Sequence, residues 1–150
     1  MVVCVLIGMV GTLVIANMDV SEDTIARNEA MRLKKLIDHL RSESVLSGKR
    51  MAIRFSKGTG QDVVGEYRFY YFDEGWKDMD DDVLSPRRLA DRIQWKWITA
   101  DSEKGMIVVD PVGSMSSFTV SLTGQSTRFS VTLDETLDIA VRAIPLAEDG

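Results

Sequence analysis

The chain has 150 residues, of which 45% are hydrophobic, with eleven glycines and three prolines, and this composition excludes a disordered protein. The formal net charge of −5 argues against a general nucleic-acid binder, because phosphate contacts require clustered Lys and Arg. A single histidine, His39, excludes the usual histidine-based metal clusters, and the lone Cys4 excludes an intrachain disulfide.

The first eighteen residues, MVVCVLIGMVGTLVIANM, contain no charged side chain. A cleaved signal peptide needs a preceding basic region and a small-x-small cleavage site, and the segment has neither. A buried helix of a soluble domain would show a polar stripe, whereas only Thr12 and Asn17 are polar here. At about 1.5 Å per residue the segment is roughly 27 Å long, just short of the ~30 Å hydrocarbon core. We predict a transmembrane helix over residues 1–18, with the bulk of the chain outside the cytoplasm because acidic residues follow it.

Residues 19–48 read as an amphipathic helix. Its apolar positions recur every three or four residues and fall on one stripe, made of Ala26, Ala30, Leu33, Ile37 and Leu40. Gly48 is a suitable residue to end this helix. One continuous helix of about 47 residues, roughly 70 Å long, is the simplest interpretation. The alternative is two helices with a hinge between Asn17 and Ser21.

After Gly48 the hydrophobic period changes from helical to alternating, which predicts strands. The predicted strands are MAIRF (51–55), YRFYYFD (67–73), IQWKWI (93–98), MIVVD (106–110), FTVSL (118–122), RFSVTL (128–133) and LDIAV (137–141). Short, turn-like links between them favour antiparallel pairing. We therefore expect an α+β chain in which the helix stripe packs on an antiparallel sheet or sandwich over residues 49–150.

Signals for catalysis are poor, and we predict no catalytic residues, no cofactor and no metal. Gly58-Thr59-Gly60 lacks the context of a phosphate loop, and Gly113-Ser114-Met115-Ser116 lacks the second glycine of a nucleophile elbow. The acidic run Asp78–Asp82 matches no EF-hand spacing, so a solvated loop is favoured over a calcium site. The aromatic residues Tyr70, Tyr71, Trp76, Trp95 and Trp97 are candidates for an interface patch, although most are expected in the core.

Several stretches, taken in order, resemble the type IV pilin-like proteins. The apolar VLIGMVGTLVI runs into RLKKLIDHLRSESVLSGKRMAIRF, and EYRFYYFDEGWKDM, DDVLSPRRLADRIQW and IVVDPVGSMSSFTVSL follow. Within that group the chain is most similar to the general secretion pathway protein H family, the minor pseudopilins of bacterial type II secretion. The similarity covers almost the whole chain.

The resemblance implies a structural protein of the pseudopilus, with its helix half in the inner membrane and a β-rich domain in the periplasm. Its partners would be the other minor pseudopilins and the major pseudopilin, through helix packing, with secreted proteins as further candidates and no nucleic acid. Carried over to this chain, the membrane and filament-core positions are Val3, Leu6, Ile7, Val10, Leu13 and Val14. The residues that dock the helix on the sheet are Ala30, Leu33, Ile37 and Leu40.

The family's basic leader, cleavage-site glycine and glutamate do not precede Met1, so we expect an in-frame upstream extension that supplies them. A minor pilin of a type IV pilus or DNA-uptake system is one alternative function. An unrelated domain held by a single membrane helix is another.

Overall fold

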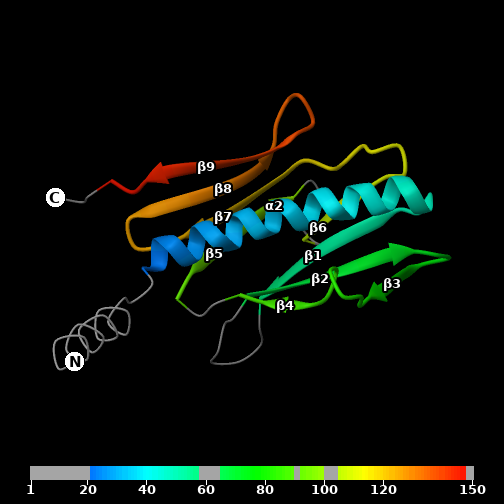
Figure 1. The fold of residues 1–150 in the computed structure, drawn as a ribbon, viewed down its shortest axis with the longest axis horizontal. Coiled ribbons are helices and arrows are strands. Elements are labelled where there is room, and N and C mark those ends of the chain that lie inside the picture. Colours follow the sequence, from blue (N-terminus) through cyan, green and yellow to red (C-terminus); the bar gives the residue numbers. More distant parts are fainter. Residues whose placement is uncertain (1–20, 58–64, 90–91, 100–104, 148–150) are drawn as a thin grey trace, which may run out of the picture.

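The computed structural model describes residues 21–57, 65–89, 92–99 and 105–147. These residues form one helix, α2 (Glu22–Ser47), followed by nine strands in two antiparallel sheets. Figure 1 shows α2 lying along both sheets, with β7, β8 and β9 on one side of it and β1, β2 and β3 on the other. The α+β class predicted from the sequence, with an N-terminal helix packed on antiparallel sheet, is confirmed.

Helix α2 begins at a capping serine and ends at a left-handed glycine. Ser21 is extended (φ −61°, ψ 149°), and its hydroxyl accepts a hydrogen bond from the Thr24 amide at 3.3 Å. Gly48 has φ 69° and donates its amide to the Ser44 carbonyl at 3.0 Å. The prediction of one unbroken helix is therefore wrong at Ser21, because a residue whose side chain caps the next helix leaves the helical conformation itself. The alternative of a hinge between Asn17 and Ser21 falls mostly on residues outside the described part of the chain.

The first sheet contains five strands, and β1 and β2 form its centre. The strand order is β3-β2-β1-β6, and β4 pairs with the same edge of β2 as β3 does. Its members are β1 (Met51–Lys57), β2 (Gly65–Phe72), β3 (Trp76–Met79), β4 (Arg87–Arg88) and β6 (Met106–Val109). Strands β3 and β4 were not predicted, since the first has two adjacent charged residues, Lys77 and Asp78, that interrupt apolar alternation and the second has two residues only.

The second sheet has the order β5-β7-β8-β9. Its strands are β5 (Gln94–Thr99), β7 (Phe118–Thr123), β8 (Thr127–Leu133) and β9 (Ile139–Pro145). Leu137 was expected on the inner face of the last strand, but it lies in the turn before β9 with φ 64° and is 48% exposed. The reason is local, because Asp134 accepts the amides of Thr136 and Asp138 through its side chain and closes the turn around Leu137.

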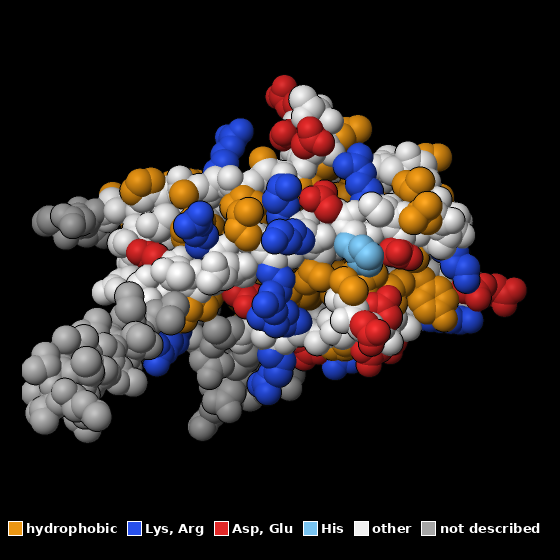
Figure 2. Space-filling view, viewed as in Figure 1, with side chains coloured by type: hydrophobic (Ala, Val, Ile, Leu, Met, Phe, Trp, Pro, Cys, Tyr) orange, Lys and Arg blue, Asp and Glu red, His pale blue; other side chains and the backbone are white. Residues whose placement is uncertain are grey.

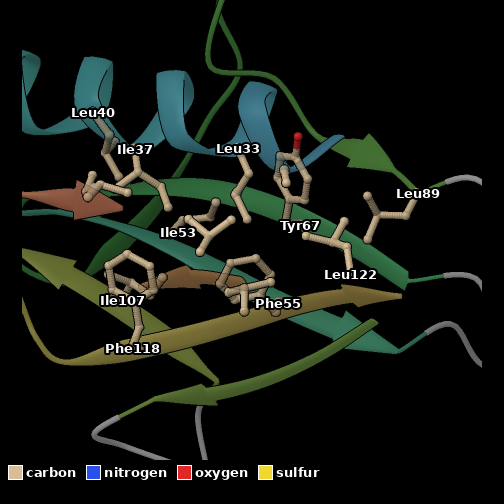
Figure 3. Close-up of a cluster of buried hydrophobic side chains, with 14 of the residues drawn as sticks. Leu33, Ile37, Leu40, Ile53, Phe55, Tyr67, Leu89, Ile107, Phe118 and Leu122 are labelled. Carbon is tan, nitrogen blue, oxygen red and sulfur yellow. The ribbon is translucent and has the colours of Figure 1, made fainter. Parts of the chain in front are cut away.

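One hydrophobic core fills the space between α2 and the two sheets. Figure 3 shows Leu33, Ile37 and Leu40 pointing from the helix toward residues of both sheets. The sheet residues labelled there include Ile53, Phe55 and Tyr67 from the first sheet and Phe118 and Leu122 from the second. All of these belong to the same buried cluster. The helix is therefore a structural part of the core and not an appendage to it.

Candidate functional site

The buried stripe of α2 is the surface that attaches the helix to the sheets. Ala30, Ile37 and Leu40 have no exposed surface, and Leu33 is 2% exposed. Ala26, one turn earlier, is also fully buried. Small residues at the start of the stripe and branched residues after it allow the helix to approach both sheets.

The predicted membrane positions Val3, Leu6, Ile7, Val10, Leu13 and Val14 lie outside the described residues. Within the described part of the chain, no helix is long and apolar enough to cross a membrane.

A carboxylate at the start of α2 joins the helix to the turn between β7 and β8. Asp23 accepts the Ser126 amide at 2.9 Å and the Thr127 amide at 3.1 Å, and it also accepts the Ser126 hydroxyl. The hydrogen bonds from Ser126 hold the pKa of the Asp23 carboxyl below its ordinary value. This contact was not visible in the sequence, because the two segments are about a hundred residues apart.

An ion pair ties the N-terminal third of α2 to β4. The Arg87 guanidinium donates through two nitrogens to the two carboxylate oxygens of Glu29, and the Glu29 side chain is 11% exposed. The hydrogen bond to Glu29 raises the pKa of Arg87. Beside this pair, the Tyr67 hydroxyl points toward α2 (Figure 3) and has no hydrogen-bond partner among the described residues. Burial raises the pKa of Tyr67, so this phenol stays neutral.

A third polar contact holds the C-terminal half of α2. The Arg41 side chain donates to the Gly113 carbonyl at 2.8 Å and to the Leu137 carbonyl at 2.6 Å. One arginine thereby connects the β6–β7 loop and the β8–β9 turn to the helix. Together with Asp23 and Glu29, it fixes α2 to the sheets at three points along its length.

The candidate residues for catalysis or metal binding do not assemble into a reactive centre in the described part of the chain. His39 is half-exposed, and its Nε2 is 4.0 Å from a carboxylate oxygen of Glu43. Within the acidic run, Asp81 accepts the Val83 and Leu84 amides and so shapes its own loop. No group of three metal-binding side chains occurs among the described residues. The aromatic candidates also separate, since Trp76 packs on Phe72 at one end of β2 while Trp95 and Trp97 lie near its other end.

Comparison with known proteins places these features in a family. The family model for the Type II transport protein GspH matches residues 29–136, which is more than half of the chain. The chain belongs to this family. The match begins at Glu29 in α2 and ends in the β8–β9 turn, so it includes Arg87 and Arg41 while Asp23 lies before it.

Two solved structures share the GspH-family fold of this chain. Both are of the minor pseudopilin EpsH from the type II secretion system of Vibrio cholerae. One has a TM-score of 0.63 and 20% identity, covering 86% of this chain and 99% of that one. The other has a TM-score of 0.62 and 19% identity, covering 80% and 96% respectively. A search of curated protein sequences gave no match.

The outer surface of this GspH-family chain is unevenly charged. Figure 2 shows Lys and Arg side chains gathered over α2 and acidic side chains at the β8–β9 turn. On the helix, Arg27, Arg32 and Lys35 are exposed and form no ion pair with any described residue. On the second sheet, a pocket of about 590 Å³ is bordered by Lys57, Gln94, Trp95, Lys96, Trp97, Ser121, Thr123 and Arg128.

Proposed function

We propose that this chain is a minor pseudopilin of a bacterial type II secretion system. It would be a structural component of the pseudopilus tip that is needed to export proteins from the periplasm across the outer membrane. The observation that carries this proposal is the family match over residues 29–136. The fold shared with EpsH, over nearly the whole of the solved EpsH chain, supports it. The role requires assembly and not catalysis.

The proposal includes a membrane anchor formed by residues 1–18, with Val3, Leu6, Ile7, Val10, Leu13 and Val14 in the membrane and the filament core. The supporting observation is the absence of charge over this segment. The globular part would then lie in the periplasm, next to the inner membrane. Partners would be the major pseudopilin and the other minor pseudopilins, through helix packing, and secreted proteins. Nucleic acid is not among them, because the chain carries a net charge of −5.

The three polar contacts of α2 have a clear use in such a protein. A subunit held in a filament by its N-terminal helix must transmit force from that helix to its sheets. Asp23, Glu29 and Arg41 each join α2 to a different loop or strand, so the load is shared and the helix cannot slide along the core. Ala30, Leu33, Ile37 and Leu40 supply the apolar part of the same attachment.

Gene deletion with complementation tests the proposal. Loss of the gene should leave exported proteins in the periplasm, and the wild-type gene should restore them to the medium. Leu6→Arg should fail to restore export, because an arginine at mid-membrane costs about 2.5–3.5 kcal/mol, whereas Leu6→Val should succeed. Export at wild-type levels from Leu6→Arg would contradict the membrane anchor, and export without the gene would contradict the function.

The lone Cys4 offers a direct test of partners. A cysteine placed in the N-terminal helix of another pseudopilin should form a disulfide with Cys4 in the membrane, and Cys4→Ser should abolish the product. Absence of cross-links to every pseudopilin of the system would contradict assembly through this helix.

A further inference from the structure

Strand β5 forms one edge of the second sheet. Within the described residues it pairs with β7 on one side and with no strand on the other. An edge of this kind can accept an added strand from another protein. Main-chain hydrogen bonds then provide affinity, and alternate side chains of the added strand provide specificity.

Among the described residues, the charged side chains that border the pocket along β5 are all positive, although the chain as a whole is acidic. The pocket along this strand includes Lys57, Lys96 and Arg128, and no carboxylate is found among the described residues that border it. None of the three cations forms an ion pair with a described residue. Unpaired cations around one pocket favour an anionic ligand.

The two faces of β5 differ in chemistry. Lys96 lies opposite Ser121 on the outer face, whereas Trp97 lies opposite the buried Val120 on the inner face. The rings of Trp95 and Trp97 are 4.9 Å apart, and both side chains are half-buried. Because successive side chains of a strand point to opposite faces, a strand added to β5 would place alternate residues beside Lys96 and beside the indoles.

We infer that β5 and its pocket bind an extended segment of a partner protein in which acidic residues alternate with apolar ones. The carboxylates face Lys96, with Lys57 adding to the positive field, and the apolar side chains cover the tryptophans. Arg128 lies on β8, two strands away from β5. The first five residues of β5, 94–98, offer a strand of roughly 17 Å, enough to pair with a segment of similar length. This inference goes beyond the proposed function and does not depend on it.

Peptide binding to the purified 150-residue chain in detergent tests the inference. The probe is a blocked hexapeptide in which Asp and Val alternate. Its control has the same composition with three Asp residues followed by three Val residues. The alternating peptide should bind about tenfold more tightly than the control, as measured by calorimetry. It should also change the tryptophan fluorescence, because two of the three tryptophans border the pocket.

Charge reversal locates the site. Lys96→Glu should weaken binding of the alternating Asp–Val peptide about tenfold. The same variant should prefer a peptide in which Lys and Val alternate. The matched control is Arg142→Glu on β9, at the opposite edge of the same sheet, which should leave binding unchanged. Several results would overturn the inference: no binding at about 1 mM peptide, equal affinity for the two Asp–Val peptides, or an equal loss of binding in both variants. Tighter binding of polyphosphate than of the peptide would also overturn the inference, because that result would indicate a site that recognises negative charge without strand pairing.

Discussion

The carboxylate of Asp23 and the amide of Ser126 lie 2.9 Å apart, although 103 positions separate them in the chain. This contact fastens the first turn of α2 to the β7–β8 turn, at the end of the domain where β9 also finishes. The contact therefore lies where the helix enters the fold.

Replacing Asp23 should make the stability of the fold depend less on pH in the acidic range. Hydrogen bonds from Ser126 lower the pKa of Asp23 in the folded state, so the carboxylate stabilises the fold above its unfolded pKa of about 3.9. That contribution is lost as the pH falls through the lower, folded-state value. Asp23→Asn should therefore melt at a lower temperature than the wild type at pH 7, and the difference should shrink in acid. Glu22→Gln, in the same turn, is the control. A difference that is constant with pH would contradict this account.

A side chain at position 124 should disrupt the same junction. A Cβ on Gly124 would lie 2.8 Å from the Asp23 Cα and 2.9 Å from its backbone nitrogen. Backbone atoms cannot rotate away, so Gly124→Ala should cost about 1–3 kcal/mol through overpacking. Gln125→Ala, in the same turn, should be nearly neutral. Denaturant unfolding of both variants measures the effect, and equal stabilities would show that the turn can move away from α2.

The Glu29–Arg87 pair should behave as a coupled unit. Glu29→Ala leaves an arginine that is 33% exposed and can be partly hydrated, so we expect a loss of about 1–2 kcal/mol, below the value for a fully buried pair. Adding Arg87→Met should recover part of this loss, because no unpaired charge then remains next to Tyr67. A double-mutant cycle by denaturant unfolding measures the coupling. Strict additivity of the two substitutions would contradict a direct interaction.

Truncation of the buried stripe should destabilise the whole fold. Leu33 is 2% exposed and contacts a core shared by both sheets, so Leu33→Ala should cost about 2–5 kcal/mol. Lys35→Ala, two residues later on the exposed face, should change stability little. Thermal unfolding followed by circular dichroism compares the two. Equal melting temperatures would show that α2 does not contribute to the core.

Periodic patterns were sufficient to predict the helix, its C-terminal glycine and most strands. Residues such as Leu33, Ile53 and Val120 repeat at the spacing of the element that contains them, and the same hydrophobic effect buries them in any compact arrangement. The α+β class follows from these local signals together. Local reasoning failed at Ser21, whose own side chain caps α2, and at Leu137, where the Asp134 side chain closes a turn.

Contacts between distant segments depended on the tertiary structure. The partners in question are Asp23 with Ser126, Glu29 with Arg87, and Arg41 with the carbonyls of Gly113 and Leu137. In none of these pairs does the sequence around one partner indicate that it contacts the other. The open edge of β5 is likewise a property of strand order, which the alternation within each strand does not specify. The sequence predicts which residues are buried, because burial needs only an apolar side chain at the spacing of the helix or strand. A hydrogen bond or an ion pair instead needs two particular atoms at about 3 Å, and only the folded chain brings those atoms together.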